Sequence, residues 1–219
     1  KDFEWFVIGG SGYGTIQQYL ILKEYYDLIN PDIILHQFCI NDFFDNNINI
    51  SSLSTTQSQY FRRPYYINGK IEKMDGLIPK LYRFFYKNSF IFKKLDQIYT
   101  YKKIVKYGRY TKNIDKGLIN ESIQITSLFL NKIREWIGPD TLYFSINCAD
   151  EKRNFLSKHW IDLIKNIKGF PIIEPSNTII NMKKNNEDVN HEDGGHLNDN
   201  GNKIYGELTA LGMLRIIND

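Results

Sequence analysis

Near the C-terminal end of the chain, Asp193 and His196 stand three positions apart with two glycines between them. A neutral imidazole carries a proton on one ring nitrogen and can accept a proton on the other. A carboxylate bound to the protonated nitrogen fixes the tautomer and stabilises the imidazolium that forms during catalysis. The two residues could therefore be a general base and the group that orients it, with a nucleophile still to be identified.

The same segment has a second interpretation. Gly194 and Gly195 permit a tight turn that would bring Asp193 back to His196. A polar stretch before an apolar periodic segment is also a common way to begin a helix, with Asn198 or Asp199 as the N-cap. The D-x-x-H spacing alone does not decide between these interpretations, so the rest of the chain has to be considered.

Two other turns contain residue types that can bind a developing negative charge. Glycines at positions 9, 10, 12 and 14 follow an apolar run, and backbone N–H groups in such a turn can donate to an anion. Asn41 and Asp42 follow a second apolar run, and the Asn41 side-chain amide is another donor. Each feature also has a plain structural explanation, as a tight corner or a helix cap.

The apolar pattern predicts the elements that would position these turns. A strand is expected over 3–8, a helix over 16–29 and a strand over 33–38, which together form a βαβ unit with a parallel sheet. Because ligands bind at the carboxyl ends of parallel strands, the three turns are expected to meet at one edge.

The remaining segments continue the α/β alternation and add an insertion at about 52–116. Further helices are expected over 117–136, 153–167 and 200–217, and further strands over 141–146 and 170–173. Polar stretches at 45–58 and 177–190 are expected to be loops. A hairpin is predicted at 65–71, where Asn68-Gly69 favours a type I′ turn, and one or two amphipathic helices are predicted within 77–112.

A dinucleotide-binding fingerprint can be tested against the glycine turn. G-x-G-x-x-G beginning at Gly10 requires glycine at position 15, which is Thr15, and beginning at Gly12 it requires glycine at position 17, which is Gln17. No P-loop Lys-Ser/Thr pair follows either. Nucleotide binding is therefore disfavoured.

The three turns, in this order, resemble the conserved blocks of the SGNH (GDSL-like) hydrolases. These are serine esterases, lipases and acyltransferases with a flavodoxin-like, three-layer α/β/α fold. The resemblance implies that Gly12 supplies one oxyanion-hole N–H and that Asn41 supplies the second donor. It implies that His196 is the general base and Asp193 its orienting residue. Cys39 stands where the family's Asn block has glycine.

The family's first block, a Gly-Asp-Ser turn that carries the nucleophile, is not found in this chain. Ser11 fits the second block better, because a nucleophile at that position would leave no segment to supply the oxyanion glycine. Since position 1 is lysine, we expect the natural polypeptide and its nucleophile to extend upstream of Lys1. The strand at 3–8 would then lack its neighbour, and a gap in the sheet or a displaced strand is expected.

Composition limits the partners. No run of about 18 apolar residues exists, so no transmembrane segment is predicted. The segment 77–112 has ten Lys and Arg residues against one acid, a charge of +9 in a chain whose net charge is +3. This basic segment could be a cap packed on the domain, or a lid or docking face for an anionic glycan, a membrane surface or a partner. Nucleic acid is not expected, because no binding motif accompanies the charge.

The expected function is hydrolysis of an acyl ester, O-acetyl esters included, through an acyl-enzyme. The substrate would be a small-molecule or glycan ester, and no metal or organic cofactor is needed. These 219 residues alone are expected to be inactive without the upstream serine. Two other functions stay open: an O-acyltransferase acting on a glycan with the same residues, and a non-catalytic carbohydrate-binding or scaffold domain.

Overall fold

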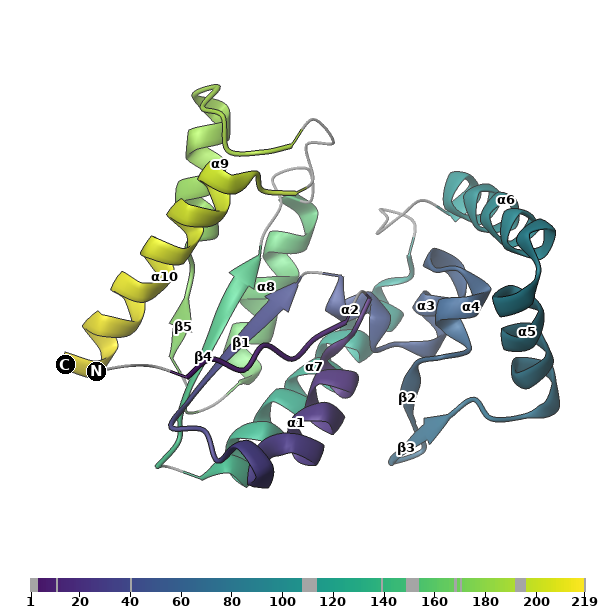
Figure 1. The fold of residues 1–219 in the computed structure, drawn as a ribbon, viewed down its shortest axis with the longest axis horizontal. Coiled ribbons are helices and arrows are strands. Elements are labelled where there is room, and N and C mark those ends of the chain that lie inside the picture. Colours follow the sequence, from purple (N-terminus) through teal and green to yellow (C-terminus); the bar gives the residue numbers. More distant parts are fainter. Residues whose placement is uncertain are drawn as a thin grey trace. The chain divides into compact units, whose positions relative to one another are not determined.

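The computed structural model describes residues 4–10, 12–39, 41–107, 114–138, 140–148, 154–167, 169, 171–191 and 196–218. Figure 1 labels the helices and strands. The chain divides into two compact units that alternate along the sequence. The first unit comprises residues 1–30 and 41–133, and the second comprises residues 31–40 and 134–219. The insertion expected at 52–116 lies entirely within the first unit.

The second unit contains a parallel sheet in the strand order β1-β4-β5. Its strands are β1 (Ile33–Cys39), β4 (Leu142–Cys148) and β5 (Ile172–Ile173). The register pairs Ile33 with Leu142 and Ser145 with Ile172. The predicted strands over 33–38, 141–146 and 170–173 and their parallel arrangement are thus confirmed. A flavodoxin-like three-layer arrangement is not established by this three-stranded sheet.

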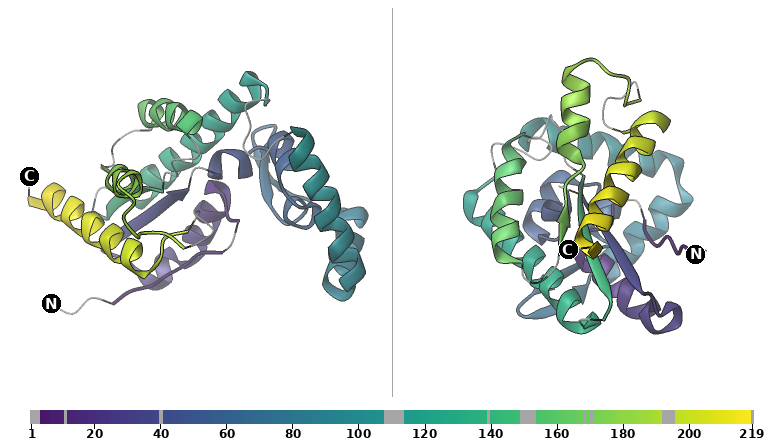
Figure 2. Two further views of the ribbon diagram at one scale, coloured as in Figure 1. Left: turned by 90° about the horizontal axis from the view of Figure 1, so that it is seen from above. Right: turned by 90° about the vertical axis from the view of Figure 1, so that its left-hand side faces the viewer.

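Helices pack around this sheet within the second unit. They are α8 (Asn154–Asn166), α9 (Ser176–Lys184) and α10 (Asp199–Asn218). Helix α10 packs against α9 and β5 (Figure 2). A Cβ at Gly212 would lie 2.6 Å from Ile173 Cγ2, so the absence of a side chain lets α10 approach β5 closely. The prediction of a loop over 177–190 is wrong for residues 177–184, which belong to α9. Ile179 is buried and holds this helix against the second unit.

The first unit has a core built from helices and a hairpin. Its regular elements are α1 (Thr15–Ile29), α5 (Leu77–Asn88), α6 (Phe90–Tyr107), the greater part of α7 (Lys116–Ile137), β2 (Pro64–Ile67) and β3 (Lys70–Lys73). Phe129 of α7 packs edge-on against Tyr19 of α1 and Tyr66 of β2. The hairpin turns at Asn68 and Gly69 with φ of 50° and 81°, as a type I′ turn requires.

The polar stretch at 45–58 is not the expected surface loop. Together with its flanking residues it forms three short helices: α2 (Asp42–Asp45), α3 (Ile48–Ser54) and α4 (Gln57–Tyr60). Its polar side chains are used as helix caps and internal ties. Asn47 Oδ1 accepts hydrogen bonds from two backbone N–H groups of α3, and Thr56 Oγ1 accepts one from α4. Composition alone suggested a loop because it does not distinguish capping from exposed polar residues.

The segment at 4–10 forms no strand and lies outside the sheet. Its apolar side chains are exposed, with Val7 at 94% and Trp5 at 72%. The prediction of a buried strand over 3–8 is therefore wrong for its described residues, 4–8. An isolated apolar run cannot form a strand without a partner for its backbone N–H and C=O groups.

Candidate active site

Gly12 occupies a position that only glycine fills easily. Its φ is +74°, in the left-handed region that disfavours residues with a Cβ. An added Cβ would lie 3.0 Å from Arg63 Nη2 and 3.3 Å from Gln59 Nε2. Backbone conformation and available space therefore both require glycine here. Ser11, the neighbouring residue, lies outside the described part of the chain.

Arg63 binds the Gly12 carbonyl with two of its nitrogens. Nε donates to Gly12 O at 3.1 Å and Nη2 donates to the same oxygen at 2.9 Å. Nη1 forms an ion pair with Asp45 Oδ1 at 2.7 Å and donates to Ser51 Oγ at 3.1 Å. The two charged side chains are only 4% and 5% exposed. Because a guanidinium removed from water needs a partner for each N–H group, burial restricts Arg63 and Asp45 to the geometry that satisfies these hydrogen bonds.

Asn41 is hydrogen-bonded to the Asp45 carboxylate, the same group that pairs with Arg63. It occupies the N-cap position of α2, but its side chain makes no capping bond. Instead Nδ2 donates to Asp45 Oδ2 at 3.0 Å. Because a carboxylate paired with a guanidinium accepts hydrogen bonds and cannot donate them, the nitrogen of the Asn41 amide must face Asp45. The alternative that Asn41 is a helix cap is therefore correct for its position, although its side chain makes no capping hydrogen bond.

Gly12 and Asn41, 29 positions apart in sequence, thus belong to one buried network through Arg63 and Asp45. The network fixes the peptide that follows Gly12 and the plane of the Asn41 amide. Among the described residues, the Gly12 N–H and the second Nδ2 hydrogen of Asn41 have no hydrogen-bond partner. The network therefore holds the Gly12 carbonyl and the Asn41 amide, and each of these residues keeps an N–H that a ligand could use, as the donors of an oxyanion site must.

Sequence analysis missed both residues that join these two donors. Asp45 could have been found, because it lies four positions after Asn41 and so on the same face of a helical turn. Arg63 gives no such signal, since it lies 51 positions from Gly12 in an insertion whose contacts depend on the fold.

A second buried tie holds the start of α1 against α2. Asn46 Oδ1 accepts from the Ile16 N–H at 3.2 Å, and Nδ2 donates to Thr126 Oγ1 at 2.9 Å. A Cβ at Gly14 would lie 2.7 Å from this Asn46 oxygen. The glycine turn is therefore fixed at both its Gly12 and its Gly14 ends.

His196 belongs to the second unit, and its side chain is exposed. Its carbonyl accepts a hydrogen bond from the His191 N–H at 3.0 Å, beside an antiparallel bridge between Asn190 and Leu197. These contacts place His196 just before α10. Asp193 falls outside the described residues, so the Asp193–His196 pair stays a prediction.

The alternative interpretation, that this segment begins a helix with Asn198 or Asp199 as N-cap, is correct for Asn198. Asn198 Oδ1 accepts from the Gly201 N–H at 2.9 Å and so caps α10, while Nδ2 donates to Asp188 Oδ1 at 2.7 Å. A cap at Asn198 is compatible with a catalytic role for His196, because the cap fixes the backbone two positions after the histidine.

Metal ligation finds no support in the described ranges, where no group of three or more His, Cys, Asp or Glu side chains could hold an ion. The chain matches no protein-family model, no curated protein and no solved structure.

Proposed function

We propose that this chain carries the oxyanion hole and the base of a serine-type ester hydrolase acting on an acyl ester. The observation that supports the proposal most is the buried network in which Arg63 and Asp45 join Gly12 to Asn41. The two donors that the family resemblance pairs are joined by one network in the first unit, and each has an N–H left for a ligand.

In the proposed reaction, a serine Oγ attacks the ester carbonyl while His196 Nε2 accepts the hydroxyl proton. The carbonyl oxygen becomes an oxyanion that the Gly12 N–H and Asn41 Nδ2 stabilise. Collapse of this intermediate breaks the bond to the alcohol, which takes the proton from His196 and leaves an acyl-enzyme. Water then repeats the attack, and the acid is released. Asp193 would hold the imidazole in the tautomer that this sequence requires.

Fluorophosphonate labelling of the complete gene product tests the assignment, with the modified residue identified by mass spectrometry. We expect label on a serine, and we expect His196→Ala to abolish it. His191→Ala is the matched control, because His191 is a second exposed histidine whose backbone pairs with that of His196. Equal labelling of both histidine variants, or no labelling of the folded protein, contradicts the proposal and favours a non-catalytic binding domain.

The oxyanion assignment has its own test with p-nitrophenyl acetate. Asn41→Ala should lower kcat about 100-fold, because one donor to the developing charge is lost. Asn49→Ala, at an exposed position of α3, should leave kcat unchanged. Faster transfer of the acyl group to an added glycan than to water would redefine the enzyme as an O-acyltransferase that uses the same residues.

A further inference from the structure

Helices α5 and α6 are built with their apolar side outward. On α5, Leu77, Leu81 and Phe84 recur at helical spacing on one face and are exposed, Phe84 by 60%. The opposite side faces inward: Tyr82 Oη donates to Asp96, and Arg83 Nη1 donates to the Phe61 carbonyl at 2.8 Å. Much of this apolar stripe is therefore left uncovered by the described part of the first unit.

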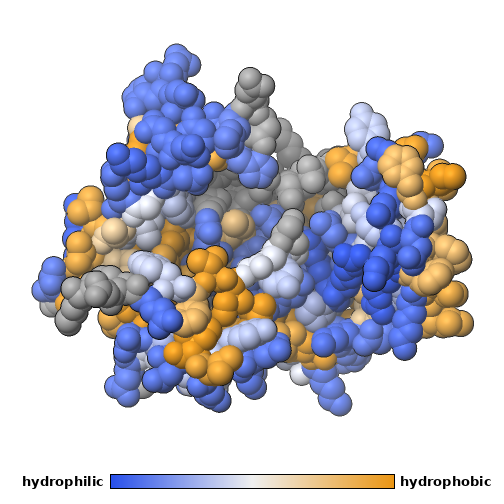
Figure 3. All heavy atoms as spheres, viewed as in Figure 1, coloured by the Kyte–Doolittle hydropathy of each residue, from blue (hydrophilic) through white to orange (hydrophobic). Residues whose placement is uncertain are grey.

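Helix α6 also exposes its apolar side chains and buries polar ones, and does so more clearly than α5. Its buried residues are polar, namely Asp96, Thr100 and Lys103, whereas Phe90 and Ile91 are 73% and 72% exposed. Lys103 Nζ donates to the Ser52 and Thr55 carbonyls, which fixes the helix by its polar side. Ile98, Tyr101 and Val105 continue the exposed apolar face. Figure 3 shows apolar side chains where Figure 1 draws these two helices.

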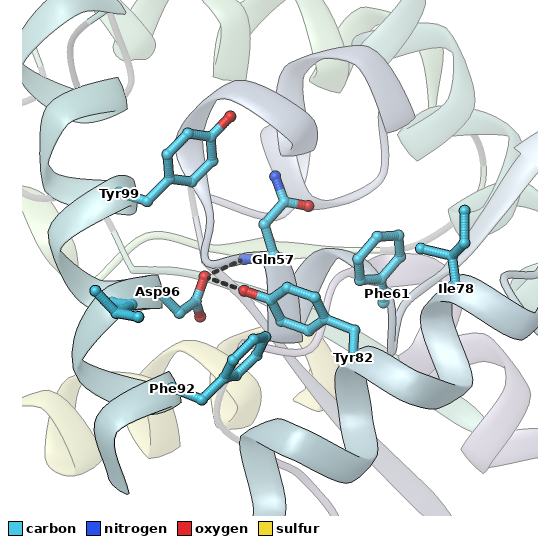
Figure 4. A pocket seen from close by; sticks show the side chains of 8 residues that line it. Gln57, Phe61, Ile78, Tyr82, Phe92, Asp96 and Tyr99 are labelled. Carbon is cyan, nitrogen blue, oxygen red and sulfur yellow. Dashed lines mark hydrogen bonds between the residues drawn. The ribbon is translucent and has the colours of Figure 1, made fainter. Parts of the chain in front are cut away.

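A groove runs between the two helices and extends this apolar surface inward. It has a volume of about 390 Å³, and its walls include Phe61, Ile78, Phe92 and Leu95 (Figure 4). Asp96 accepts hydrogen bonds at its floor from the Tyr82 hydroxyl at 2.7 Å and the Gln57 N–H at 3.2 Å. The one acid of the two helices is therefore buried inside the unit, with both hydrogen bonds on its Oδ1.

The positive charge of these helices indicates which kind of surface they could bind. Exposed lysines border the apolar face at positions 80, 87, 94 and 102. Aliphatic and aromatic side chains ringed by lysines match a bilayer interface with anionic headgroups, where the rings enter the acyl region and the ammonium groups meet phosphate. A polysaccharide would leave the leucine and isoleucine side chains in water, and a second copy of the same face would oppose like charges.

We propose that α5 and α6 form a peripheral docking surface for a membrane rich in anionic phospholipid. The surface lies flat on the bilayer and does not cross it. In keeping with this, none of the helices in the described part of the chain combines the length and apolar character of a membrane span. This inference goes beyond the proposed ester hydrolysis and does not depend on it.

Vesicle co-sedimentation of the 219-residue chain tests the proposal. We expect binding to vesicles of phosphatidylcholine and phosphatidylglycerol at a 3:1 ratio, and little binding to phosphatidylcholine alone. Replacing Lys87, Lys94 and Lys102 by Gln should weaken partitioning about 100-fold, at roughly fivefold per lysine. The matched control replaces Lys23, Lys165 and Lys203, which are exposed lysines elsewhere on the chain. Equal loss in both triple variants would overturn the proposal.

The apolar face is tested separately. Phe84→Ser with Phe90→Ser should weaken vesicle binding at least tenfold, whereas Leu28→Ser, at an equally exposed apolar position of α1, should not. In a Phe90→Trp variant, brominated lipid should quench the new fluorescence. Absence of quenching, with equal binding to heparin, would show a general polyanion site and overturn the membrane proposal. A dimer in ultracentrifugation that Phe84→Ser with Phe90→Ser dissociates would overturn it in favour of self-association.

Discussion

Two buried polar clusters of the first unit both contact α3 but are built differently. The Arg63 cluster is a complete ion pair, in which Asp45 uses both carboxylate oxygens and Arg63 also binds Ser51 of α3. The Asp96 cluster has neutral donors, a tyrosine hydroxyl and a backbone N–H, while Lys103 binds carbonyls at the end of α3. Burial, followed by the hydrogen bond to Asp96, raises the pKa of Tyr82, so its hydroxyl stays a donor.

The difference between the clusters indicates what each one positions. The Arg63 cluster holds two potential ligand donors, Gly12 and Asn41, in a fixed relation. The Asp96 cluster holds a helix by its polar side and leaves the apolar side exposed. Buried charge therefore organises a candidate site in one case and a candidate docking face in the other. The ion pair is expected to be the less tolerant of the two, because removal of one partner leaves a buried charge.

The largest expected effect is that of breaking the ion pair. Arg63→Met should lower the free energy of unfolding by about 3–5 kcal/mol, since Asp45 would remain buried and unpaired. Urea-induced unfolding followed by circular dichroism measures it. Arg62→Met, at the exposed neighbouring arginine, should cost less than about 1 kcal/mol. Adding Asp45→Leu to Arg63→Met should restore part of the loss. An equal cost for the two single arginine variants would contradict the comparison.

A buried group that is kept neutral gives a contrasting case in the second unit. Burial lowers the pKa of His36 to about 4, and its ring stacks on Tyr143 of β4. The folded-state pKa lies below the ordinary value of 6.5, so the contribution to stability is complete above pH 6.5. It is lost as the pH falls towards 4, by about 1.4 kcal/mol per pH unit and about 3 kcal/mol in all.

Denaturant unfolding at pH 4.5–7 checks this expectation. His36→Phe should flatten the pH dependence, and His191→Phe, at an exposed histidine, should leave it unchanged. A slope that survives in His36→Phe would assign the pH dependence to another group.

A smaller effect is expected where the ion pair meets the glycine turn. Gly12→Ala should lower the free energy of unfolding by about 2 kcal/mol, because alanine at this φ is strained and its Cβ meets Arg63. Gly9→Ala should be close to neutral, since nothing lies within 4 Å of its added Cβ. Thermal unfolding of the two variants makes the comparison, and similar melting temperatures would show that Gly12 is not constrained.

The smallest effect is expected in the Asp96 cluster. Tyr82→Phe removes one of two hydrogen bonds to the carboxylate and should cost about 1 kcal/mol. Tyr101→Phe, an exposed tyrosine of α6, should cost nothing measurable. A cost for Tyr82→Phe as large as that of Arg63→Met would show that the two clusters do not differ in the way proposed.

Local sequence patterns predicted the helices and turns whose periodicity or turn residues are unambiguous within a single segment. The periodicity of 16–29 and 117–136 predicted α1 and α7, and Asn68-Gly69 predicted the hairpin turn. Prediction was wrong where local composition was ambiguous. The polar residues at 45–58 cap short helices, and the apolar residues at 4–8 pair with no strand that the structure describes.

By itself the sequence determined the parallel strands over 33–38, 141–146 and 170–173 and most of the helices, because spacing and turn chemistry are local properties. The candidate donors Gly12 and Asn41 were predicted through the resemblance of their turns to a known family. Only the tertiary structure decided that Arg63 and Asp45 join those donors, since residues 51 positions apart meet through folding alone. It also decided which side of α5 and α6 is exposed. Periodicity reveals that a helix has an apolar face, but burial of Asp96 and Lys103 shows which way that face points.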